Sequence, residues 1–523
     1  MDETVAWLRE RPYYAGQIRT HEVLAGEEAN SADLEVDDRL ESSLADRGIE
    51  RLYGHQADAV EAVRAGEDAV IATATASGKS LAYTVPAFER AMDRRATTLY
   101  LAPQVALIND QTETLSELAG EMGFASGVDV AQYTGRQSRS EKEAVRDRQP
   151  TVLLCTPDML HYALLPHARR LWTWFFERLE TVVVDEVHEY RGVFGSHVAL
   201  VFRRLARLCE EFGADPEFVC CSATIGNPVE HAATVTGRDP NTIRLVDTDE
   251  SESGPTHWLF WNPPEYGGDG WGIGRRKSSH TETERLFCDL VAEGYQTLVF
   301  TGARQTAERY ASESAKTLRE RGEHDLADGV VAYQAALTND RRREIERGLH
   351  SGDVRGVWST NALELGVDIG GLDAVLLDGY PGTRMDAHQQ AGRAGRGTDP
   401  SLVVLVGFDV GRDIVRGAIR SLVRLRTLWR FLVRREVLCR IRDAFGRGEL
   451  DYLRASYSPS SSSSSSAAQS SAACARAALK SSFIHSYISA ALASDGGRSS
   501  SLMFSTCIYA FNRFIFFSSL SVA

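Results

Sequence analysis

The chain has 523 residues, of which 43% are hydrophobic and 25% are charged. This length and composition predict a packed protein of two or three domains and exclude a chain that is disordered throughout. Its net charge of −14 is unevenly distributed, because residues 401–523 hold 16 basic and 7 acidic residues and residues 1–400 hold 42 basic and 65 acidic. Lysine is scarce in the chain, and an acidic surface with few lysines indicates adaptation to high salt. Bulk acidity also argues against a nucleic-acid partner unless a local basic track exists.

The cysteines and the two ends of the chain bear on its compartment. No C-x-x-C pair occurs among the eight cysteines, so neither a disulfide framework nor a zinc site is predicted. The first residues lack the pattern of a signal peptide. An apolar stretch over 502–523 is interrupted by Asn512 and Arg513 and is a poor membrane span. We therefore expect a cytoplasmic protein with no membrane partner.

Residues 1–49 have apolar positions at helical spacing, which predicts one or two surface helices leading into a first domain over 50–246. Within that domain, short β-rich runs alternate with helix-length amphipathic segments. The predicted strands are Ala69–Ala72, Thr98–Ala102, Thr151–Cys155, Thr181–Val184 and Glu217–Cys221. Such alternation is typical of a mostly parallel sheet with helices on both faces, which is the α/β class.

Acidic residues, Pro263-Pro264 and several glycines give residues 247–284 the composition of a linker. A second alternating series follows over 285–406 and predicts a second, similar α/β domain. Its predicted strands are Gln296–Thr301, Val330–Tyr333, Gly356–Ser359, Ala374–Asp378 and Ser401–Val406. Residues 407–523 form an atypical tail, first basic and then rich in serine, which we expect to be partly disordered.

A Gly-Lys-Ser sequence lies between the first predicted strand and the helical segment 81–91. This is the context of a phosphate-binding loop, in which backbone N–H groups of 76–80 surround phosphates at a helix amino terminus. Lys79 would reach the outer phosphates and Ser80 would bind Mg²⁺. The usual first glycine of the motif is replaced by Thr73.

Asp185 and Glu186 follow three valines, so both carboxylates are predicted at the carboxyl end of a buried strand, where α/β folds bind ligands. We expect Asp185 to hold the metal and Glu186 to orient and deprotonate the attacking water.

Two arginines and one glutamine complete the pattern. Arg393 and Arg396 lie three residues apart, so on one helical turn both could face a transition-state phosphate as arginine fingers. Gln56, placed just before a predicted helix, is a candidate for reading the adenine edge.

These motifs, in this order, resemble the DExH-type superfamily 2 helicases over about 35–406. The adenine-reading element is similar to residues 48–56, motifs Ia and Ib to residues 102–107 and 156–160, motif V to residues 359–368 and motif VI to residues 389–396. The amino-acid sequences of residues 185–199 and 360–383 are similar to those of the Hrq/MrfA branch of RecQ-related DNA repair helicases. The resemblance implies two tandem RecA-like domains, ATP and Mg²⁺ as cofactors, and 3′–5′ translocation on single-stranded DNA.

The site residues expected on these grounds fall into four groups. The catalytic group is Lys79, Asp185, Glu186, Gln389, Arg393 and Arg396. The ATP-binding group is Gln56, Thr75, Ala76, Ser77, Gly78, Lys79, Ser80, Gly366 and Asp368, with Ser80 and Asp185 on the metal. The resemblance implies a coupling group of His188, Ser222 and Thr224. It also implies contacts to the nucleic-acid backbone from Pro103, Gln104, Thr156, Pro157 and Thr360.

The chain departs from the family pattern in two places. Gln104 stands where a threonine is common, a change that should preserve a polar backbone contact. Relatives also carry a carboxyl-terminal domain with four metal-binding cysteines, and nothing similar follows Val406, which suggests a shifted reading frame or a gene fragment. Two alternatives to a DNA helicase stay open: an RNA helicase, because the core motifs contact sugar-phosphate, and an inactive nucleic-acid-binding remnant.

Overall fold

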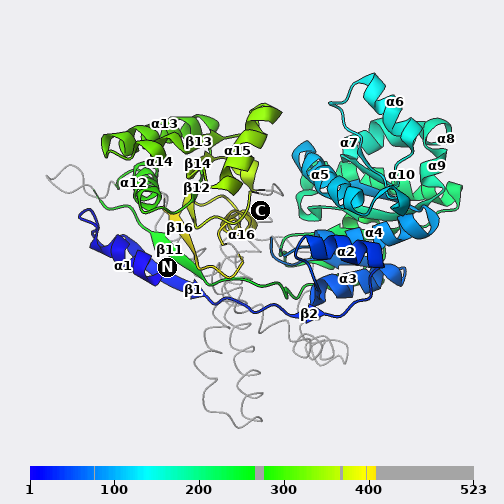
Figure 1. Ribbon diagram of the computed structural model, residues 1–523, viewed down its shortest axis with the longest axis horizontal. Helices are drawn as coiled ribbons and strands as arrows, with labels where there is room; N and C mark the ends of the chain where they lie inside the picture. Colours follow the sequence, from blue (N-terminus) through cyan, green and yellow to red (C-terminus); the bar gives the residue numbers. More distant parts are fainter. Residues whose placement is uncertain (76, 266–275, 365–368, 396, 408–523) are drawn as a thin grey trace, which may run out of the picture. The chain divides into compact units, whose positions relative to one another are not determined.

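The computed structural model describes residues 1–75, 77–265, 276–364, 369–395 and 397–407. Two seven-stranded, mostly parallel sheets flanked by helices dominate this part of the chain (Figure 1). All ten predicted strands are present, with ends displaced by at most two residues. The α/β class with two similar lobes is therefore confirmed.

The strands of the first sheet are all parallel. In spatial order they are β10 (Ile243–Val246), β4 (Asp68–Ile71), β9 (Glu217–Cys221), β8 (Leu179–Val184), β5 (Thr97–Leu101), β7 (Val152–Cys155) and β6 (Val130–Gln132). The helices around it are α2 (Asp38–Asp46), α3 (Gly54–Arg64), α4 (Ser80–Arg94), α5 (Val105–Glu121), α6 (Arg139–Arg148), α7 (Pro157–Met159), α8 (Ala168–Leu171), α9 (Thr173–Phe176), α10 (Gly192–Phe212) and α11 (Pro228–Thr236). Single turns lie at η1 (Phe124–Ser126), η2 (Leu160–Leu164), η3 (Leu165–His167) and η4 (Val187–Glu189).

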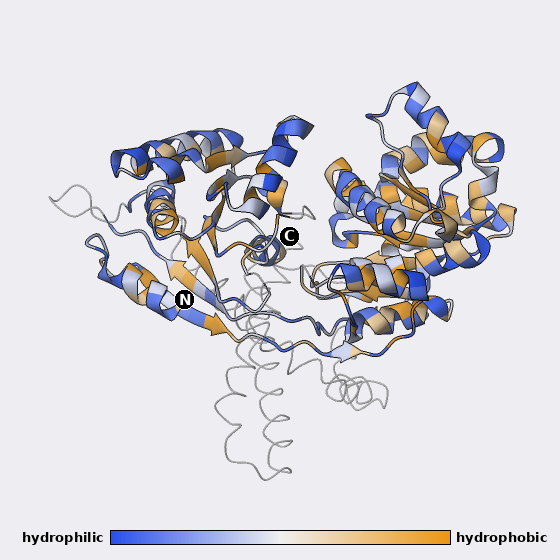
Figure 2. Cartoon of the chain, in the orientation of Figure 1, coloured by the Kyte–Doolittle hydropathy of each residue, from blue (hydrophilic) through white to orange (hydrophobic). Residues whose placement is uncertain are grey.

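Side chains alternate along these strands between two hydrophobic clusters, one on each face of the sheet. Helices α2 to α5 cover one cluster, and α7 to α11 cover the other. The strands are accordingly hydrophobic along almost their whole length, whereas the helices show polar outward faces (Figure 2). Burial on both faces is what a parallel sheet requires. Because all seven strands run in the same direction, their carboxyl ends lie along one edge of the sheet.

The second sheet has the spatial order β1 (Ile18–Leu24), β11 (Thr256–Trp261), β16 (Ser401–Val406), β15 (Ala374–Asp378), β12 (Thr297–Phe300), β14 (Gly356–Ser359) and β13 (Val330–Tyr333). Only the edge strand β1 runs antiparallel to its neighbour. The accompanying helices are α1 (Asp2–Glu10), α12 (Ser279–Ala292), α13 (Arg304–Glu320), α14 (His324–Asp328), α15 (Asn339–Ser351) and α16 (Arg384–Ala391), with a single turn η5 (Asn361–Leu363). No helix in the described part of the chain is long and apolar enough to cross a bilayer.

One or two helices were expected over 1–49, and α1 and α2 are present, but the segment also contains strands. Strand β1 joins the second sheet by pairing with β11, and Val5 and Leu8 of α1 are buried in the core of the same lobe. Helix α2 instead packs on the first lobe. Strands β2 (Ser31–Ala32) and β3 (Leu52–Tyr53) flank α2 in the chain and pair in a two-stranded ladder. The amino-terminal segment therefore belongs to both lobes.

The expected linker over 247–284 was wrong in part, because β11 is a buried strand in the interior of the second sheet. Its aromatic residues pack at the centre of that lobe, and this apolar run is short enough to be overlooked among acidic and glycine-rich neighbours. Residues 250–253 pair with the chain leaving β1: Glu27 and Ser253 exchange backbone hydrogen bonds of 2.8 and 3.0 Å. The lobes are thus joined by two antiparallel segments.

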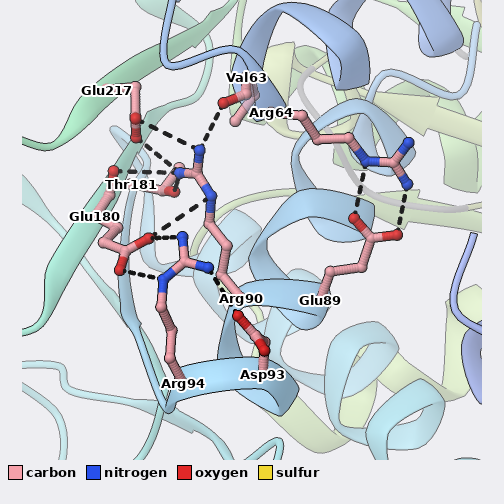
Figure 3. Close-up of polar contacts among 9 residues, drawn as sticks. All are labelled: Val63, Arg64, Glu89, Arg90, Asp93, Arg94, Glu180, Thr181 and Glu217. Atoms are coloured by element: carbon pink, nitrogen blue, oxygen red, sulfur yellow. Dashed lines mark hydrogen bonds and ion pairs between the residues drawn. The ribbon is translucent and has the colours of Figure 1, made fainter.

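Helix α4 is fixed to the sheet by a buried ion-pair network (Figure 3). The Arg90 guanidinium donates to Glu217 (2.7 Å), to the Thr181 hydroxyl (2.9 Å) and to the carbonyl of Val63. Arg90 is 8% exposed, so these bonds compensate for the burial of its charge. The network holds the helix that begins at the Gly-Lys-Ser sequence.

Replacing Arg90 with alanine is expected to lower the free energy of unfolding by about 3–5 kcal/mol, because it leaves Glu217 half-buried without its partner. Chemical denaturation measures this loss. Arg139→Ala is the control, because Arg139 pairs with Glu143 on an exposed helix surface and its loss should change the free energy of unfolding far less. Equal effects of the two substitutions would contradict the structural role of Arg90.

Candidate nucleotide-binding and catalytic site

The Gly-Lys-Ser loop lies between β4 and α4, as predicted. Gly78 has φ +72°, and a Cβ there would lie 2.4 Å from Nε2 of Gln56, so only glycine fits. The Lys79 ammonium donates to the carbonyls of Thr73 (3.2 Å) and Ala74 (2.6 Å), inside the loop. Thr73, at the position of the usual first glycine, shares a 2.7 Å hydrogen bond with the buried Ser77 hydroxyl.

Gln56 is the third residue of α3, not a residue preceding it, so that detail of the prediction was wrong. Its amide oxygen accepts the N–H of Tyr53 (2.9 Å), and its amide nitrogen donates to the carbonyl of Gly78 (2.8 Å). The side chain therefore caps the helix and braces the phosphate loop at once.

Two residues that sequence reasoning missed also hold this loop. The Nε2 atom of His55 lies 2.9 Å from the Ser77 carbonyl, and Asp249 accepts the N–H of Ala74 (3.1 Å). The position of His55 beside Gln56 is a signal that could have found the first. No local pattern identifies Asp249, which comes from a segment 175 residues away.

Asp185 and Glu186 lie at the carboxyl end of β8, as predicted, and are separated from β4 only by β9. Tyr100 donates its hydroxyl to Asp185, a contact that the motifs did not predict. Glu186 has φ +48°, an uncommon value for a residue with a side chain, and it follows the strand in a sharp turn.

Both carboxyl groups are half-buried, and their partial removal from water raises the pKa of each. For Glu186 the burial and the nearby Asp185 charge raise the pKa to about 8, against an opposing effect of Lys79 and Arg393. A pKa near neutrality suits a group that must accept a proton from water.

His188, in η4, connects three parts of the site. Its Nδ1 accepts the N–H of Ala223 (3.1 Å) and lies 3.4 Å from Glu186 and 3.4 Å from the Ser222 hydroxyl. Burial lowers the pKa of His188 to about 3, so the ring is neutral at physiological pH. Because Nδ1 accepts a hydrogen bond, the proton of the neutral ring lies on Nε2.

Gln389, in α16 of the second lobe, lies with its Nε2 2.9 Å from Nε2 of His188. Among the described residues the Gln389 amide oxygen has no partner and is buried. We therefore assign the amide with its oxygen toward the ring, where it accepts the His188 Nε2–H. This bond joins the second lobe to the segment that follows Glu186.

The arginine pair was predicted on one helical turn, and this was wrong: α16 ends at Ala391 and Arg393 lies in the turn beyond it. The Arg393 side chain is 9% exposed and donates from Nη2 to the carbonyl of Glu364 (3.0 Å). Burial raises the pKa of Glu364 to about 7, and its carboxyl accepts the amide of Gln390 (3.1 Å). Arg393 lies close enough to Glu186 to lower its pKa.

The other predicted residues are distributed as follows. Ser80 is the first residue of α4, and Thr224 is exposed. Thr75 packs beside Gly392 of the second lobe, so closely that a Cβ at Gly392 would lie 3.4 Å from its side chain. Ala76, Gly366, Asp368 and Arg396 lie outside the described residues, as does most of the predicted tail.

The predicted nucleic-acid residues also follow strands, but different ones. Pro103 and Gln104 follow β5 and precede α5, whose N-cap is Gln104. Thr156, the N-cap of α7, and Pro157 follow β7, and Thr360 follows β14 in the second lobe. Since β5 and β7 lie beyond β8 in the first sheet, Pro103, Gln104, Thr156 and Pro157 occupy the other half of the edge that carries the phosphate loop.

The comparisons with known proteins agree with this geometry. A model of the DEAD/DEAH box helicases matches residues 53–232, and a model of the helicase conserved C-terminal domain matches residues 282–398. The chain is 42% identical over 374 residues to the uncharacterised ATP-dependent helicase YprA of Bacillus subtilis, covering 71% of this chain and 48% of the relative. It is 38% identical over 364 residues to the ATP-dependent helicase HRQ1 of Saccharomyces cerevisiae, covering 69% and 33%.

Among solved structures, the crystal structure of the DUF1998 helicase MrfA bound to DNA matches with a TM-score of 0.73 at 38% identity, covering 80% of this chain and 54% of that one. MrfA bound to DNA and AMPPNP matches with the same TM-score at 37% identity, covering 82% and 57%. The chain thus spans about half the length of YprA and MrfA and a third of HRQ1. The chain belongs to the superfamily 2 DEAD/DEAH-box helicases, in the branch that contains the Hrq and MrfA helicases.

Proposed function

We propose that this chain is an ATP-dependent DNA helicase that moves 3′ to 5′ along a single strand. The observation that carries the proposal is the bond between Gln389 and His188, because it connects the second lobe to the carboxylate that would activate water. A motor requires such a connection, since hydrolysis must change how two parts grip the strand.

ATP would bind with its phosphates against the backbone of Thr75–Ser80 and its adenine near Gln56, with Gly366 and Asp368 as further contacts. Lys79 would leave its loop carbonyls for the outer phosphates. Glu186 would take a proton from the attacking water, and Arg393, with Arg396, would stabilise charge on the transferred phosphoryl group.

Mg²⁺ fits the donors at this edge, because the Ser80 hydroxyl and the Asp185 carboxylate are hard oxygen ligands. When bound, the ion neutralises charge on the phosphate oxygens. The hydrogen bond from Tyr100 orients Asp185 for that role.

The strand would cross the other half of the same edge, at Pro103, Gln104, Thr156 and Pro157, and reach Thr360 on the second lobe. These residues are uncharged, so backbone N–H groups at the amino terminus of α5 would supply positive potential in an otherwise acidic lobe. Such contacts recognise phosphates and carry no sequence information. Changes at Glu186 would pass through His188 to Ser222 and Thr224, and so to the strand.

The relatives support DNA as the partner, because MrfA was solved in complex with it. A role in DNA repair rests on the resemblance to the Hrq/MrfA branch alone. ATP hydrolysis should be stimulated more strongly by single-stranded DNA than by RNA of equal length, and unwinding should require a 3′ tail. Stimulation by RNA alone would identify an RNA helicase, and unwinding from a 5′ tail alone would reverse the polarity.

Lys79→Ala is expected to lower kcat for ATP hydrolysis by about 10²–10³-fold, because a preorganised positive group at the phosphates is lost. A coupled assay with saturating DNA measures the rate, and Lys316→Ala, whose side chain is exposed on α13, is the matched control. Equal residual rates in the wild type and the Lys79 variant would indicate an inactive remnant.

A further inference from the structure

A cluster of two histidines and an aspartate lies in the second lobe, where β1, β11 and α1 meet, apart from the residues assigned to ATP and DNA (Figure 1). Nε2 of His21 lies 3.0 Å from Nδ1 of His257, and the Asp2 carboxylate lies 3.8 Å from that Nδ1. One ligand atom from each residue lies within 4.8 Å of the other two.

The backbone fixes the two histidines relative to each other. In the β1–β11 ladder His21 is opposite Leu259 and His257 is opposite Val23, so the histidines are diagonal neighbours on one face of the sheet. Leu259 on that face belongs to the same core as Val5 and Leu8 of α1. Helix α1 therefore packs on the face that carries the histidines, with Asp2 in its first turn.

The spacing of the two facing ring nitrogens, 3.0 Å, suits a shared metal ion. Neutral imidazole nitrogens are the ligand atoms that such an ion takes. Metal–nitrogen bonds are about 2.0–2.1 Å, so two nitrogens on one ion lie about 3–3.4 Å apart, close to the observed distance. The exposed Asp2 side chain can rotate to bring a carboxylate oxygen onto the ion as a third ligand.

We propose that His21, His257 and Asp2 bind one divalent transition-metal ion of the Zn²⁺, Co²⁺ or Ni²⁺ class, which clamps α1 and the edge strand β1 onto the second lobe. Two imidazole nitrogens and one carboxylate bind metals of this class better than they bind Mg²⁺ or Ca²⁺, which prefer all-oxygen ligands. Arg9 is a positive neighbour of His21 and opposes the binding of a cation. The site is independent of the helicase assignment.

The test uses the full chain after treatment with a chelator and gel filtration. Titration with Co²⁺ alone should produce visible d–d absorption that saturates at one ion per chain, and Zn²⁺ should abolish it. Saturating Zn²⁺ should also raise the unfolding temperature, because an ion that binds only the folded state stabilises it.

His21→Gln should weaken the Co²⁺ affinity about tenfold or more and remove the Zn²⁺-dependent rise in unfolding temperature. Asp2→Asn, which is exposed and cannot compromise the core, should weaken binding in the same direction. His324→Gln is the control, because His324 is exposed in the same lobe and outside the cluster. Absence of Co²⁺ absorption in the wild type, or equal affinity in the wild type and both cluster variants, would overturn the proposal and leave a hydrogen-bonded imidazole pair.

Discussion

Replacing Arg393 with alanine is expected to lower kcat for DNA-stimulated ATP hydrolysis by about 10³-fold or more, the range lost with an arginine finger. Arg393 is buried near Glu186, and its anchor to the Glu364 carbonyl presents the guanidinium from the opposite lobe. KM for ATP should change far less than kcat, because the charge that the arginine stabilises develops in the transition state.

Steady-state kinetics at saturating single-stranded DNA measure both constants. Arg309→Ala is the control. Arg309 lies on the exposed face of α13, where it forms an ion pair with Glu313. Arg393 also donates a hydrogen bond to the Glu364 carbonyl, so its loss could disturb the fold. Circular dichroism is the check, and we expect an unchanged spectrum in the variant. A loss confined to KM would assign Arg393 to ground-state binding of ATP and contradict the finger.

Glu186→Gln is expected to reduce kcat by about 10²–10⁴-fold, the contribution of a general base. ATP binding should persist, because glutamine keeps the shape of the side chain and Lys79 is untouched. Fluorescent-nucleotide titration and single-turnover hydrolysis separate the two effects. Retained turnover would show that another group accepts the proton.

The raised pKa of Glu186 also makes the stability of the protein depend on pH. The pKa of Glu186 is about 8 in the folded protein and near 4.5 when exposed, so the unfolded state binds fewer protons between these values. Stability is therefore lost as pH rises from about 4.5 through 8. Glu186→Gln should be similar to wild type at pH 5 and more stable than wild type at pH 8. Denaturation midpoints without Mg²⁺ measure this, and a difference independent of pH would contradict it.

Much of the fold was predictable, because buried parallel strands give continuous apolar runs between amphipathic helices. The runs before Asp185 and Ser222 were located correctly for this reason. Strand β1 was missed because it does not alternate cleanly in hydrophobicity, and β11 because its short apolar run lies among acidic and glycine-rich residues. Their pairing spans more than 200 residues. Register between distant segments is set by tertiary packing, which no local pattern reports.

The candidate site was predictable where one motif supplies both the residue and its neighbours, as in the Gly-Lys-Ser loop. Contacts made by Tyr100, His55 and Asp249 were not, because each depends on which strands become adjacent. The position of Arg393 beyond α16 follows from the end of the helix at Ala391, whereas the arginine spacing alone suggested a continuing turn. Spacing identifies residue types, but caps and strand order decide where they point.

The long-range pairing of β1 also has a consequence for biosynthesis. Residues 18–24 leave the ribosome early, but their partner at 256–261 follows about 230 residues later, a delay of about 12–50 s at 5–20 residues per second. During that interval an edge strand with unsatisfied backbone groups is available to chaperones or to other nascent chains. The first lobe can fold in the meantime, so the order of synthesis makes the second lobe the slower and more vulnerable half to assemble.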